Sequence, residues 1–222
     1  MKKQNVRSAL ALGALAALSM MLPQYAFSAH ATRHTDAVPF SYPNSLLDAP
    51  ATLTKPLGAG TRLGKPIVVL EHTPIEAVTD LTGAVRVRDG RGDFARDILC
   101  VTGTEHGKPM ISWLISSDNK TITETQIEWL GDRTVPAVCK PLKGEHLPVR
   151  IGSVGLGQQK DDILKRLGKP SLYDEDGWYF WFSQRFLRNE RNLQELELNW
   201  LAVHFDANGE SDKSFSAQVT NL

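Results

Sequence analysis

The sequence predicts an α+β fold built from two tandem units, each a short helix packed on an antiparallel β-meander. Two short segments with helical apolar spacing end at Gly83 and at Gly168. Each is followed by alternating, strand-like segments with turn residues between them. The offset between the halves is nearly constant, since the two glycines are 85 residues apart and the turn residues Asp118 and Asp206 are 88 apart.

The first helix is expected to start at Thr73, which can act as the N-cap. Pro74 suits the first helical position and Glu76 completes a capping box. Gly83 ends the helix. The apolar residues on one helical face are Ile75, Val78 and Leu81.

The second helix is expected at Lys160 to Leu167, with Gly168 and Pro170 as stop signals. No Ser, Thr, Asp or Asn stands where an N-cap is wanted. The apolar residues on its buried face are Ile163, Leu164 and Leu167.

Strand patterns follow each helix. They cover residues 98–101, 110–116 and 121–130 in the first half, and 178–183, 196–205 and 213–220 in the second. One face of such a meander is apolar and needs the helix as cover, while the other face is expected to stay open. The alternation changes phase within 196–205, which predicts a bulge near Trp200.

The chain starts with the layout of a secretory signal peptide in residues 1–29. A basic start precedes the apolar run Ala9–Leu22, and small residues near Ala29 supply a cleavage site. We expect the remaining chain to divide into a linker or arm at 30–62, a first helix-plus-sheet unit at 63–145 and a second at 146–222.

Composition points to a soluble, exported protein. Three of the 25 basic residues and none of the 25 acidic residues lie in 1–29, which leaves 22 basic and 25 acidic residues. This balance has no excess of basic residues, which does not favour nucleic-acid binding. No later segment is apolar enough to span a membrane. A lipoprotein would need a cysteine at the end of the apolar run, so a periplasmic or secreted location is expected.

The two cysteines, Cys100 and Cys139, are expected to form one disulfide. Cys100 lies in a strand-like segment and Cys139 lies near prolines. Disulfides persist in exported proteins, and this one would close a loop of about 40 residues. The alternative is a pair of free thiols, one of them nucleophilic, although neither has a histidine beside it in sequence.

The second half resembles the SmpA/OmlA family, which includes the small lipoprotein of the outer-membrane β-barrel assembly machinery. The segments that carry the resemblance are Gly155–Gly157, Asp162–Pro170, Asp176–Phe180 and Val203–Gly209. The resemblance extends to the tandem architecture of β-lactamase-inhibitor protein, and it implies an exported, non-enzymatic binding module. The chain departs from the family in lacking a lipidated cysteine and in its charged insertion at 184–195.

The sequence singles out no catalytic residue, no cofactor site and no metal site. The glycine-rich segment 151–157 lacks the Lys-Ser/Thr of a P-loop and the spacing of a nucleophile elbow. The six histidines do not form a ligand pattern for zinc. The acidic turn 174–176 is shorter than a calcium loop.

Aromatic residues give the nearest pointer to function. The run Trp178–Phe182 is entirely aromatic, and alternation places part of it outward. We expect Tyr179, Trp181, Trp200 and His204 to line the open sheet face and contact a partner, because such aromatics dominate binding hot spots. The predicted function is a non-enzymatic protein-binding or inhibitor-like module whose partner is another envelope or secreted protein. The alternatives are a periplasmic or secreted hydrolase with an unrecognised site, and an envelope structural protein.

Overall fold

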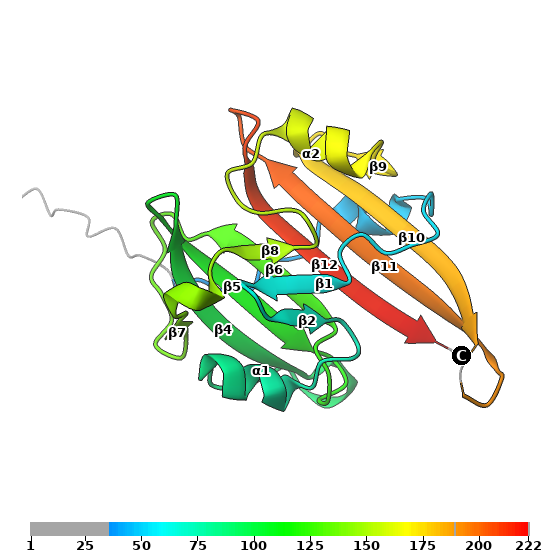
Figure 1. Ribbon diagram of the computed structural model, residues 1–222, viewed down its shortest axis with the longest axis horizontal. Coiled ribbons are helices and arrows are strands. Elements are labelled where there is room, and N and C mark those ends of the chain that lie inside the picture. Colours follow the sequence, from blue (N-terminus) through cyan, green and yellow to red (C-terminus); the bar gives the residue numbers. More distant parts are fainter. Residues whose placement is uncertain (1–35, 189, 222) are drawn as a thin grey trace, which may run out of the picture. The chain divides into compact units, whose positions relative to one another are not determined.

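The strands of both halves of the chain meet in one large sheet (Figure 1). The computed structural model describes residues 36–188 and 190–221, so the predicted signal peptide at 1–29 lies outside the described residues. Within them, the sheet has nine strands in the order β3-β4-β5-β6-β12-β11-β10-β9, and β7 pairs with β4. Every pairing is antiparallel except that of β7 with β4. The predicted α+β class with an antiparallel sheet is therefore confirmed.

The nine strands are β3 (Val87–Asp89), β4 (Arg96–Glu105), β5 (Lys108–Ser116), β6 (Glu124–Trp129), β7 (Lys140–Pro141), β9 (Leu172–Tyr173), β10 (Trp178–Arg188), β11 (Gln194–Phe205) and β12 (Ser211–Asn221). A smaller antiparallel sheet has the order β2-β1-β8, formed by β1 (Gly60–Leu63), β2 (Ile67–Val69) and β8 (Val149–Ile151). The helices are α1 (Ile75–Thr82) and α2 (Lys160–Leu167), with 3-10 turns η1 (Asn44–Asp48), η2 (Gly92–Phe94) and η3 (Gly144–His146).

The two α-helices lie where the sequence predicts them. Gly83 ends α1 in the left-handed region at φ 68°, which glycine adopts without strain. The predicted capping box is wrong, because Pro74 takes the N-cap position and no side chain caps the helix. Thr73 instead accepts a hydrogen bond from the backbone N–H of Val69 at 2.8 Å, which fixes the preceding turn.

The inner face of the nine-stranded sheet is the face covered by α1, α2 and the smaller sheet, which lie on the viewer's side in Figure 1. Ile75 and Val78 of α1 and Ile163 of α2 pack here and are almost fully buried. The sheet residues in this core include Leu99, Val101, Met110, Leu114, Ile127, Trp181, Leu201, Val203 and Phe205. Burying each large side chain contributes about 1.5–3 kcal/mol, so this layer is the main core.

The outer face is the opposite face of the sheet. The expectation that it stays open is wrong for its central part, because the arm at residues 36–54 crosses it; Figure 1 shows this blue segment behind the sheet. Leu46 is buried on β10 to β12, whereas Leu47 is exposed. The arm ends beside the edge of β10, where Phe182 accepts from the backbone N–H of Leu53 at 3.2 Å.

The segment predicted as an insertion at 184–195 extends a β-hairpin. β10 continues to Arg188 and β11 starts at Gln194, with unbroken pairing between them. The predicted bulge near Trp200 is wrong, since Trp200 pairs in register with both neighbouring strands, and the register shift lies between His204 and Phe205. The change of phase instead reflects apolar residues on both faces of one long strand.

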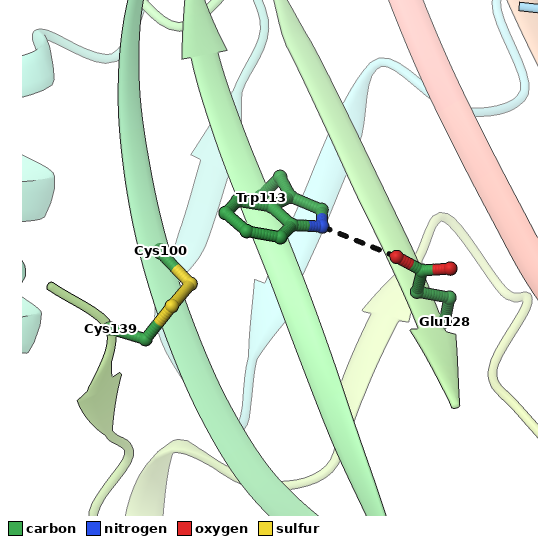
Figure 2. Close-up of a disulfide and its surroundings, with 4 residues drawn as sticks. All are labelled: Cys100, Trp113, Glu128 and Cys139. Carbon is green, nitrogen blue, oxygen red and sulfur yellow. Dashed lines mark hydrogen bonds between the residues drawn. A yellow bond between two sulfur atoms is a disulfide. The ribbon is translucent and has the colours of Figure 1, made fainter. Parts of the chain in front are cut away.

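The predicted disulfide between Cys100 and Cys139 is confirmed (Figure 2). It ties β4 to the segment that leads into β7, which then pairs in parallel with β4. Both cysteines are nearly buried on the outer face, beside Trp113 and Ile98. The bridge therefore fixes a long loop against the sheet.

Candidate functional site

The structure separates the four residues predicted to share one open face. Tyr179 pairs with Val203 and Trp181 pairs with Leu201, which places both aromatics on the inner face. Trp181 is only 1% exposed, and its indole N–H donates to the carbonyl of Gly168 at 3.2 Å. Directly paired residues point to the same side of a sheet, so the predicted outward placement of Tyr179 and Trp181 is wrong.

Trp200 and His204 do lie on the outer face. Their direct neighbours are Phe182, which stacks on Trp200 at 4.9 Å between ring centroids, and Trp178, which lies 5.3 Å from His204. Sequence reasoning missed Phe182 and Trp178 as members of this face. The signal that identifies them is the β10–β11 register, which pairs Phe182 with Trp200 and Trp178 with His204.

His204 holds the turn that precedes β10. Its Nδ1 bonds the carboxylate of Asp212, and its Nε2 lies 2.8 Å from the carbonyl oxygen of Asp176. Both partners are acceptors, so only the doubly protonated imidazolium satisfies both. The hydrogen bond to Asp212 raises the pKa of His204, although partial burial opposes the shift. This histidine therefore positions the outer-face aromatics rather than standing free for chemistry.

An apolar surface continues from these aromatics to the far end of the β10–β11 hairpin. We call it the hairpin patch, and its residues are Phe182, Phe186, Leu196, Leu198, Trp200 and Val219. Phe186 is 63% exposed and Val219 is 40% exposed. Phe186 pairs with Leu196, and Leu198 lies between Gln184 and Val219, so the side chains form one surface across three strands.

The inner face of the same hairpin is polar. Arg185 donates to both carboxylate oxygens of Glu197, at 2.6 and 2.9 Å. Asn199 and Gln218 are nearly buried, and Gln218 donates to Glu71 at 2.9 Å. The usual arrangement of a sheet end is thus reversed, with buried polar groups on the core side and apolar groups on the exposed side. Phe182 and Trp200 pack against the buried cluster around Leu46, whereas Phe186 and Val219 stay exposed. The exposed part of the patch is therefore a candidate contact surface.

A hollow of about 450 Å³ lies on the outer face beside the disulfide. Its lining includes Ile98, Cys100 and Trp113 from the sheet, and Val38 from the arm. Figure 2 shows Trp113 between the disulfide and Glu128, to which its indole N–H donates at 3.4 Å. Trp113 is thereby fixed as a flat apolar wall.

Within residues 36–188 and 190–221, no three His, Cys, Asp or Glu side chains are placed to hold a metal ion. Among the same residues, no helix has the length and apolar character needed to cross a membrane. Comparison with protein-family models, curated proteins and solved structures found no match to this chain.

Proposed function

We propose that the chain is an exported, non-enzymatic protein-binding or inhibitor-like module of the cell envelope, and that the hairpin patch is its contact surface. The observation that carries this proposal is the reversed polarity of the β10–β11 hairpin. Glu197 is buried and paired on the inner face, while Phe186 is 63% exposed on the outer face. A surface of this kind gains stability when a protein partner covers it.

The patch also has the composition of a binding hot spot. The stacked pair Phe182 and Trp200 forms a rigid base, and Phe186 stands beyond it. Hot-spot aromatics contribute about 2 kcal/mol or more each when a partner buries them. A partner with an apolar pocket of its own would therefore be recognised mainly by Phe186 and Trp200.

The order of elements supports a further part of the proposal, that the chain consists of two tandem helix-plus-sheet units. In the first half, α1 is followed by β3 to β6, which are consecutive neighbours in the sheet; in the second, α2 is followed by β9 to β12, which are neighbours as well. The halves meet where β6 pairs with β12. This agrees with the proposed resemblance to SmpA/OmlA proteins and to β-lactamase-inhibitor protein. The signal-like layout of residues 1–29 supports a role in the periplasm or outside the cell.

The proposal is tested by capture of partners from a periplasmic or secreted extract with three forms of the protein. Phe186→Asp places a charge in the patch, and Phe94→Asp is the matched control, since Phe94 lies in η2 and is 90% exposed. We expect a partner that the parent and Phe94→Asp retain and that Phe186→Asp loses. A partner retained equally by all three proteins would exclude the hairpin patch as its binding surface.

A further inference from the structure

We call the part of the outer face that lies under residues 37–42 the groove, and one of its side chains bonds the backbone of the arm. Gln126 of β6 accepts from the backbone N–H of Phe40 at 2.9 Å and donates to the carbonyl of Phe40 at 3.1 Å. A neighbouring β-strand would offer the same donor and acceptor pair to a peptide. The side chain of Gln126 therefore binds the backbone of the arm, and this contact does not depend on which side chain stands at position 40.

Aromatic side chains of the groove also contact the arm. The ring of Phe40 lies 5.7 Å from that of Trp178 and 6.2 Å from that of Phe215. Two residues later, Tyr42 lies 5.6 Å from Phe215, and its hydroxyl donates to Glu124. The spacing of two is that of side chains on one face of an extended segment.

One end of the groove is acidic. Glu124, Glu71 and Asp118 line a cavity of about 240 Å³ next to Tyr42. Within the described residues, none of these three carboxylates pairs with a lysine or arginine. Burial raises the pKa of Glu124, and the hydrogen bonds from Tyr42 and Gln126 and the charge of Arg96 oppose this shift only in part. A positive side chain in this cavity would be complementary to it.

The other end of the groove is mainly apolar, although Arg88, Asp89 and Arg96 also line it, and it is only partly filled. The hollow beside the disulfide has Val38 and Pro39 of the arm on one side and Trp113 on another. Val38 is 64% exposed, so it does not fill this space. The arm thus fills the centre of the groove and leaves a cavity beside each end.

We propose that this groove, formed by Ile98, Trp113, Glu124, Gln126 and Phe215, is a binding site for an extended segment of a partner protein. The preferred segment carries a large apolar residue, an aromatic residue and a lysine or arginine at alternate positions, in place of Val38, Phe40 and Tyr42. Residues 37–42 occupy the site in the isolated chain and so inhibit it. The site does not depend on the hairpin patch, and either can fail without the other.

Competition with the arm determines the strength of binding. A tethered segment acts at a high effective concentration, of the order of millimolar for short flexible connections. A free peptide must therefore be more complementary than the arm, or the arm must be weakened. Phe40→Ala weakens the arm, because it removes the ring held between Trp178 and Phe215 while leaving the groove itself intact.

The experiment is fluorescence anisotropy with labelled peptides and the disulfide-intact chain that starts after residue 29. One peptide has the natural sequence of residues 36–43, a second carries V38L and Y42K, and a third adds F40A to the second. We expect the second peptide to bind the Phe40→Ala protein about tenfold more tightly than the first, a difference of about 1.4 kcal/mol. The third peptide should bind at least tenfold more weakly than the second.

A control variant and a check of folding accompany the peptide measurements. Glu124→Gln in the Phe40→Ala protein should remove the advantage of the Y42K peptide, while circular dichroism verifies folding. Equal binding of the second and third peptides, or no peptide binding to the Phe40→Ala protein, would overturn the proposal. A concentration-dependent dimer of the parent that Phe40→Ala abolishes would assign the groove to the arm of a second copy and would also overturn it.

Discussion

Trp181→Ala tests the assignment of the two sheet faces. Trp181 is 1% exposed, packs with Leu201 against the inner core and donates to the carbonyl of Gly168. Truncating a buried tryptophan costs about 3–5 kcal/mol, since apolar burial is lost and a cavity remains. A loss of about 4 kcal/mol with a urea slope of about 2 kcal/mol per molar lowers the unfolding midpoint by about 2 M.

The assay is equilibrium unfolding in urea, followed by far-ultraviolet circular dichroism to avoid the loss of a fluorophore. Phe186→Ala is the matched control, because Phe186 lies on the opposite, outer face of the same strand and is 63% exposed. The control should change the free energy of unfolding by no more than about 0.5 kcal/mol. A Trp181→Ala protein as stable as the parent would refute the inner-face assignment.

Three further predictions concern stability. The raised pKa of His204 means that its bond to Asp212 stabilises the fold below the unfolded histidine pKa of about 6.5, and that this contribution is lost as pH rises through the folded pKa. The free energies of unfolding of the parent and of His204→Gln, compared between about pH 5 and pH 9, measure this contribution. A difference between the two proteins that stays constant across that range would contradict it. Replacing both Cys100 and Cys139 by serine should cost about 4 kcal/mol in the chain-entropy model, measured by urea unfolding, and an unchanged midpoint would show that the bridge constrains little. The raised pKa of Glu124 favours the protonated form in the folded protein, so its contribution to stability is greatest below the unfolded pKa of about 4.3 and falls as pH rises. Glu124→Gln should therefore raise the melting temperature at neutral pH. A lower melting temperature than that of the parent would count against this.

Local features of the fold could be predicted from the sequence. Gly83 and Gly168 mark the ends of both helices, and the turns at Asp118 and Asp206 separate strands as expected. These features depend on residues near one another in the chain. The Cys100–Cys139 bridge was also predictable, because two cysteines in a chain with a signal-like start allow only one intramolecular pair.

The facing of the aromatic residues could not be predicted, because the run from Trp178 to Phe182 has no polar residue to mark its outer side. The β10–β11 register decides it by pairing Trp181 with Leu201 and Phe182 with Trp200. A one-residue change of register would exchange the two faces.

The position of the arm on the outer face could not be predicted from the sequence either. Phe40 is held by Gln126, which stands 86 residues later in the chain, and the segment around Phe40 has no regular periodicity of its own. A contact of this kind depends on where the assembled sheet places β6 and β12. The same long-range dependence explains why the groove, the hollow beside the disulfide and the acidic cavity gave no signal in the sequence.

Site-specific photo-crosslinking in the cell that produces the protein tests whether the hairpin patch contacts a partner. A photoreactive phenylalanine analogue replaces Phe186 in one protein and Phe94 in the other, since both side chains are exposed. We expect a discrete crosslinked protein adduct from position 186 and none from position 94. Adducts of the same partner from both positions, or from position 94 alone, would contradict the assignment of the hairpin patch as the binding surface.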